Sequence, residues 1–214
     1  MEYSEIPTSK ISGSGRLTVP GHGIFKISGS GRISPELVKT SGSSKIPGGL
    51  KVGEVKTSGS STIEGDIEAE FIKVSGSARV EGSVTCEDID KSGSLRVEKD
   101  INCESAQFSG STDIEGYGRF KNELLNSGSL KVGEDIESEG HIRFSGSINV
   151  EGRVTAKSFE GRLGRKDSHI REGIEADYIE IEPGRNNSRG EGYMVTTEIL
   201  GKTITLENWE SNNV

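Results

Sequence analysis

Three histidines are the first residues of this sequence that could carry chemistry, because three imidazole groups form a common zinc-binding set. They are His22, His141 and His169, and long stretches of chain separate them. They also occupy different positions of the repeat that organises the chain, so they cannot converge within one molecule. We therefore interpret them as polar surface residues.

Gly201-Lys202-Thr203 is similar to the end of a phosphate-binding loop. Such a loop needs a second glycine five residues earlier, and that position is Thr196. The sequence contains neither a Gly-x-Ser-x-Gly nucleophile elbow nor a Cys-x-x-Cys pair. We therefore predict that the protein is not an enzyme and that it needs no cofactor or metal ion.

The tripeptide Ser-Gly-Ser recurs through most of the chain and reveals its organisation. It begins at Ser12, Ser28, Ser41, Ser58, Ser75, Ser92, Ser109, Ser127 and Ser145. Four consecutive steps are 17 residues long, the last two are 18, and the short step of 13 residues after Ser28 predicts a pinched coil. A flexible Gly/Ser linker has no reason to keep such a period.

An aliphatic residue stands at position 6 of every unit, counted from the first serine. This core ladder consists of Leu17, Ile33, Ile46, Ile63, Val80, Val97, Ile114, Val132 and Val150, and Ile170 continues it in a unit without the tripeptide. Apolar or small residues also recur at positions 4, 10, 12, 15 and 17. Pairs spaced by two residues are typical of a strand with one buried face, and polar or glycine corners separate the three pairs.

This pattern predicts an all-β fold: a single-stranded parallel β-helix with three faces and about ten coils of ~17 residues. We expect a short N-terminal tail over residues 1–11, the β-helix over 12–182, and a loop with C-terminal strands over 183–214. The final residues show no capping signal, so we also expect the natural protein to extend further.

Cys86 and Cys103 occupy position 12 of adjacent units, which places them within reach of a disulfide. Two cysteines are too few for a disulfide framework and suit a reducing compartment, so we expect buried free thiols. Stacking also creates a basic row at position 5 and an acidic row at position 7. We interpret these rows as a salt-bridge ladder, with a divalent-cation site or a partner surface along Glu64 to Glu115 as the alternatives.

Composition limits the partners. The chain has 214 residues, 30% of them hydrophobic, and a net charge of -8 with a pI near 5.1. This charge argues against nucleic acid and against anionic membranes as main partners. No apolar run approaches the ~18 residues of a membrane span, and the first residues lack the features of a signal peptide, so we expect a cytoplasmic protein.

Residues 75–82 (Ser-Gly-Ser-Ala-Arg-Val-Glu-Gly) and 145–152 (Ser-Gly-Ser-Ile-Asn-Val-Glu-Gly) carry a resemblance to a known family. Over roughly residues 10–182, the chain resembles the bactofilins, which are polymer-forming cytoskeletal proteins. The resemblance implies a right-handed coil and nucleotide-independent filaments of end-stacked β-helices that act as scaffolds. It leaves membrane or cell-envelope partners open, although the sequence shows none.

Physical reasoning also favours self-assembly into a homopolymer. One coil buries about five side chains at ~1.5–3 kcal/mol each, which cannot offset the backbone entropy of 17 residues, so coils must stack. Terminal coils then expose unpaired strand edges. We expect apolar side chains at the N-terminal end to supply the assembly surface, namely Leu17, Ile24, Phe25 and Ile27.

Two other functions stay open. A β-helical enzyme of the hexapeptide type, such as an acyltransferase or a carbonic anhydrase, would show a strict 18-residue period, and the 17-residue steps argue against it. An extracellular adhesin or ice-binding rod would need a secretion signal and a flat, uncharged face.

Overall fold

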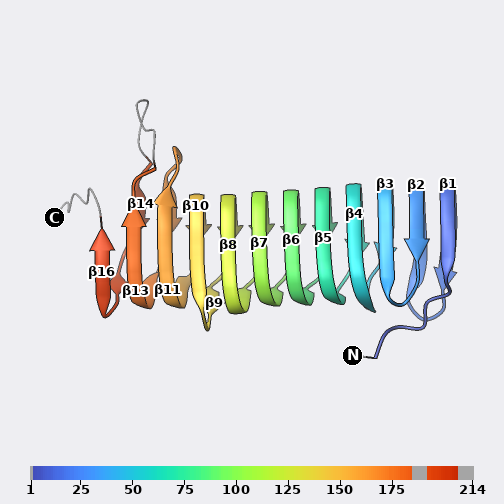
Figure 1. Ribbon diagram of the computed structural model, residues 1–214, viewed down its shortest axis with the longest axis horizontal. Coiled ribbons are helices and arrows are strands. Elements are labelled where there is room, and N and C mark those ends of the chain that lie inside the picture. Colours follow the sequence, from blue (N-terminus) through green and yellow to red (C-terminus); the bar gives the residue numbers. More distant parts are fainter. Residues whose placement is uncertain (1, 185–191, 207–214) are drawn as a thin grey trace.

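The computed structural model describes residues 2–184 and 192–206, which form strands that stack into a rod (Figure 1). The N-terminal half contains β1 (Ser9–Val19), β2 (Gly23–Ile33), β3 (Leu37–Pro47), β4 (Leu50–Glu64), β5 (Ile67–Val80), β6 (Val84–Val97), β7 (Ile101–Ile114) and β8 (Gly118–Val132). The C-terminal half contains β9 (Ile136–Ser138), β10 (His141–Val150), β11 (Arg153–Leu163), β12 (Ser168–Ile170), β13 (Gly173–Glu182), β14 (Met194–Thr196), β15 (Ile199–Leu200) and β16 (Thr203–Leu206). No helix in the described residues is long and apolar enough to cross a membrane.

Parallel pairing begins with β3 and continues to the C-terminal strands, so the predicted all-β, stacked-coil fold is confirmed. The row that starts at Ile46 pairs successively with Ile63, Val80, Val97, Ile114, Val132, Val150, Ile170 and Thr196. These nine rungs make about nine turns, with 17 or 18 residues between most of them. The chain is therefore a β-solenoid.

The first two strands depart from the expected parallel coil. β1 pairs antiparallel with β2, and β2 pairs antiparallel with β3. Two turns reverse the chain: the His22 amide donates to the Val19 carbonyl across Pro20-Gly21, and Ser34 and Leu37 exchange backbone hydrogen bonds. The short step after Ser28 is thus a hairpin, and the prediction of a pinched coil is wrong.

The core ladder lies inside the rod. Ile33, Ile46, Ile63, Val80, Val97, Ile114, Val132, Val150 and Ile170 are all buried, whereas Leu17 is half-buried. Ile33 is out of line with the others, because the hairpin pairs it with Val38 rather than with Ile46. Burial alternates along each strand on both sides of exposed corners, as the two-residue spacing predicts.

Glycine at the centre of each Ser-Gly-Ser tripeptide makes one of these corners. Gly59 and Gly76 pair with each other and have φ angles of +104° and +118°, a region that favours glycine. A Cβ atom on Gly76 would also collide with the backbone carbonyl of Gly59. Both constraints explain why the tripeptide recurs wherever the chain turns this corner.

The two cysteines form a disulfide between adjacent coils. Cys86 on β6 pairs in register with Cys103 on β7, and their Cα atoms are 4.7 Å apart. Both residues are buried, as expected, but the prediction of free thiols is wrong, because stacking brings the two sulfur atoms into bonding range. The cysteine-based argument for a reducing compartment therefore loses its support.

Candidate assembly surface at the ends of the rod

The N-terminal end of the described rod is the free edge of β1, which pairs only with β2. The preceding residues do not extend this edge. Instead, the Ser4 amide donates to the Lys51 carbonyl at 2.7 Å, and the Tyr3 hydroxyl donates to Glu70 at 2.6 Å. These contacts hold the leading segment against β4 and β5. The backbone groups along the outer edge of β1 are consequently available for pairing.

Apolar side chains at this end are more covered than the sequence suggested. Phe25 and Ile27 are buried, because β1 packs over β2 and Leu17 pairs directly with Phe25. They cannot supply an exposed surface, and that part of the prediction is wrong. Ile24 is 38% exposed, and Leu17 and Ile11 are half-buried, so the remaining apolar surface at this end is small.

The C-terminal end exposes more of the core. Among the described residues, six large hydrophobic side chains are exposed, and four of them lie in the last coil: Tyr193, Val195, Leu200 and Ile204. Ile204 is the informative one, because it pairs with the fully buried Ile179 and yet is itself 42% exposed. Its position belongs to the core row, and no described strand stacks on its outer side.

Ile199 and Leu206 show the same effect. They pair with the buried Ile174 and with Ile181, respectively, but both are only partly buried. The sequence analysis missed this surface because β14 to β16 lack the Ser-Gly-Ser marker. The alternation in Thr203-Ile204-Thr205-Leu206 was the available signal.

Charged rows run along the sides of the rod and form diagonal ion pairs. Lys45 pairs with Glu64 at 2.8 Å, and Arg79 pairs with Glu98 in the same geometry. The hydrogen bond from Lys45 lowers the pKa of Glu64 and raises that of Lys45. Each pair joins position 5 of one coil to position 7 of the next, which is the arrangement of a salt-bridge ladder. Such exposed pairs contribute little stability individually.

The structure does not bring the three histidines together. His22 is half-buried in the β1–β2 turn, whereas His141 on β10 and His169 on β12 are exposed. Lys202 of the Gly-Lys-Thr motif forms an ion pair with Asp177 at 2.7 Å and lies next to strand β16 rather than at a helix.

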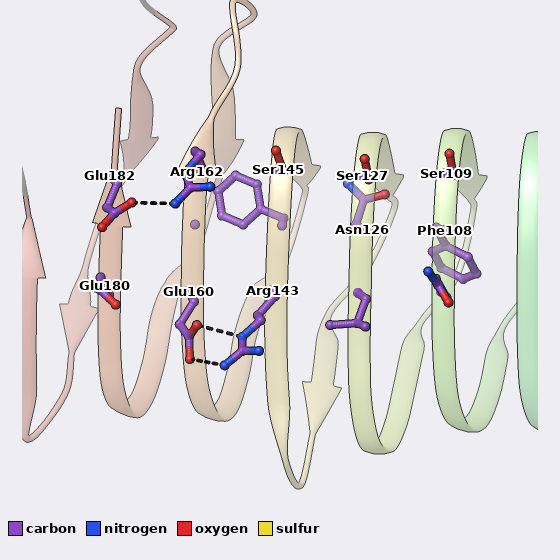
Figure 2. A pocket seen from close by; sticks show the side chains of 14 residues that line it. Phe108, Ser109, Asn126, Ser127, Arg143, Ser145, Glu160, Arg162, Glu180 and Glu182 are labelled. Carbon is purple, nitrogen blue, oxygen red and sulfur yellow. Dashed lines mark hydrogen bonds and ion pairs between the residues drawn. The ribbon is translucent and has the colours of Figure 1, made fainter. Parts of the chain in front are cut away.

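A groove of about 500 Å³ crosses β7, β8, β10, β11 and β13 (Figure 2). Its charged groups largely neutralise one another: Arg143 contacts Glu160 at 2.7 Å, and Arg162 contacts Glu182 at 3.0 Å. Asn126 lies in line with Phe108 and Phe144, and its buried Oδ1 atom has no hydrogen-bond partner in the described residues. This groove therefore presents an uncharged acceptor and balanced charges.

Comparisons with protein family models, curated proteins and solved structures found no match to this chain.

Proposed function

We propose that this protein is a self-assembling scaffold whose β-solenoids join end to end into filaments without nucleotide. The observation that carries the proposal is the partly open core at the C-terminal end, where Ile204 is 42% exposed in a row that is buried elsewhere. The free edge of β1 supplies a second open end. A strand from another copy would complete both the apolar row and the backbone hydrogen bonding.

The resemblance to bactofilins supports the same function, because that family forms nucleotide-independent filaments of stacked β-helices. It also supports a cytoskeletal role in the cytoplasm. Stacking at the ends uses surfaces that differ from the charged sides, so the salt-bridge ladders remain solvated in the filament.

Light scattering combined with negative-stain electron microscopy tests this function. Wild-type protein should form filaments at micromolar concentration, equally well with and without ATP or GTP. Ile204→Glu places a charge in the joint and should shorten the filaments into small units. Phe71→Glu is the matched control, because Phe71 is 46% exposed on the side of the rod.

Two results would contradict the proposal. One is a monodisperse monomer over the whole concentration range, and the other is assembly that appears only with nucleotide. If Phe71→Glu shortened filaments as much as Ile204→Glu, contacts between the sides of rods, rather than end stacking, would hold the assembly together. Circular dichroism of each variant checks that the solenoid remains folded.

A further inference from the structure

A strip of cations and hydroxyl groups runs along one side of β1 to β5. The outward cation row contains Arg16, Lys26, Lys45, Thr62 and Arg79, which pair in register across the five strands. A parallel hydroxyl row contains Ser14, Ser28, Ser43, Ser60 and Ser77. All ten residues line a shallow groove of about 710 Å³, which we call the basic strip. At ~4.8 Å per strand, the strip is roughly 19 Å long.

Charge in this part of the chain is opposite to that of the whole. Residues 9–47 contain six Lys or Arg and a single Glu, a local charge of +5 in a chain of net charge -8. Within the described residues, Lys45 is the only one of these six cations with an ion pair; the five without one are Lys10, Arg16, Lys26, Arg32 and Lys39. Farther along the rod, diagonal acidic partners are common.

The uncompensated cations also lie next to one another. Arg16 pairs with Lys26, and Lys26 pairs with Lys45, so like charges occupy neighbouring strands. On the other side of the Ser-Gly-Ser corner, Lys10 pairs with Arg32, and Arg32 pairs with Lys39. Like charges directly opposite each other destabilise a sheet. An anionic ligand would relieve this repulsion.

We propose that the basic strip binds an acidic polysaccharide, with the carboxylates of uronate units on the cation row and the sugar hydroxyls on the serine row. The groove follows the rod axis and repeats one cation and one hydroxyl per strand, which suits a narrow linear polymer with one anionic group per unit. Hydrogen bonds from cations to carboxylates are charge-assisted and strong.

Other polyanions fit this surface less well. No aromatic side chain lines the groove, whereas proteins that bind single-stranded nucleic acid use aromatic residues to stack the bases. A membrane or a long duplex would also meet the acidic coils that follow, because the basic strip covers only five strands. The strip lies on the side of the rod, so this binding does not depend on the proposed filaments.

Affinity electrophoresis in gels that contain polygalacturonate tests the proposal, with dextran gels as the neutral reference. Polygalacturonate should retard the wild-type protein, and dextran should not. The double variant Arg16→Gln/Lys26→Gln should weaken the retardation roughly tenfold or more, because each cation near an anionic surface contributes about 1 kcal/mol. Arg16→Lys/Lys26→Arg keeps the charges and should preserve it.

The matched control is Lys131→Gln/Lys157→Gln, which removes the same charge from exposed positions on β8 and β11. An equal loss of retardation in this control would reduce the effect to net charge and overturn the proposal. Absence of retardation of the wild type at physiological salt would do the same. Tighter binding to duplex DNA or to phosphatidylglycerol vesicles would assign the strip to another class of partner. Thermal unfolding of each variant confirms that the strands remain paired.

Discussion

The ammonium group of Lys91 donates a hydrogen bond to the Thr112 hydroxyl across 2.9 Å in the interior of the solenoid. A second hydrogen bond reaches the Ser111 carbonyl at 2.7 Å, and the ammonium nitrogen lies 5.9 Å from the centre of the Phe108 ring. Lys91 stands in an inward row, between Val74 and Phe108. Its side chain is fully buried, and burial lowers its pKa to about 8.

This pKa predicts that stability rises in alkaline solution. The folded protein releases the Lys91 proton near pH 8, whereas the unfolded chain keeps it until its ordinary pKa of 10.5. Between these values the unfolded state binds more protons, so the free energy of unfolding increases with pH, and below pH 8 the cost of burying the charge is fully present. Urea unfolding from pH 7 to 10.5 measures the slope.

Lys91→Met should remove this slope and stabilise the protein at pH 7 by about 1–3 kcal/mol, because an apolar chain of similar length replaces a buried charge. Lys121→Met serves as the reference, since Lys121 is an exposed lysine that pairs with Glu104. The same pH dependence in wild type and Lys91→Met would show that Lys91 is not the titrating group.

The disulfide predicts the outcome of thiol titration. Denatured protein without reductant should contain no reactive thiol, and reduction should release two. Cys86→Ala/Cys103→Ala should lower the free energy of unfolding by about 3 kcal/mol, the entropic value for a loop of this length. Alanine suits the row, because Ala69 is the register partner of Cys86. Two thiols in denatured, unreduced protein would contradict the disulfide.

Gly76→Ala tests the corner at the Ser-Gly-Ser row. The variant combines a φ of +118° with a Cβ atom that would meet the Gly59 backbone, so we expect a loss of about 1–3 kcal/mol in the free energy of unfolding. Ser75→Ala changes an exposed neighbour and should stay within about 0.5 kcal/mol. Equal thermal unfolding of the two variants would refute the corner's need for glycine.

The coil could be predicted from the sequence because like positions stack, and stacking demands the same residue type at each rung. Strand direction could not, because Ser-Gly-Ser reads the same both ways. Gly13 meets Gly29 in an antiparallel pair as well as Gly59 meets Gly76 in a parallel pair. The evidence for reversal lay in the turn residues, Pro20-Gly21 and Pro35.

The candidate site was harder to predict than the fold. Burial of Phe25 depends on β1 folding back over β2, and exposure of Ile204 depends on its place in the last described coil; both are tertiary facts that a repeat pattern does not contain. Net charge was similarly misleading, because a chain of -8 can hold a basic strip when its cations and carboxylates segregate along the axis.

Val97→Asp tests the core ladder that the repeat predicts. Val97 is fully buried between Val80 and Ile114, so an aspartate there would lie without a partner in an apolar row. We expect the free energy of unfolding to fall by about 3–5 kcal/mol, the range for an uncompensated buried charge. Gln107→Asp adds the same charge at an exposed position of β7 and should leave the unfolding midpoint nearly unchanged. Urea titrations of both variants measure the difference, and a similar midpoint for the two would refute the inward register of position 6. Because the rungs stack, a loss at Val97 should also weaken amide protection in β5 and β7, which hydrogen exchange measures strand by strand.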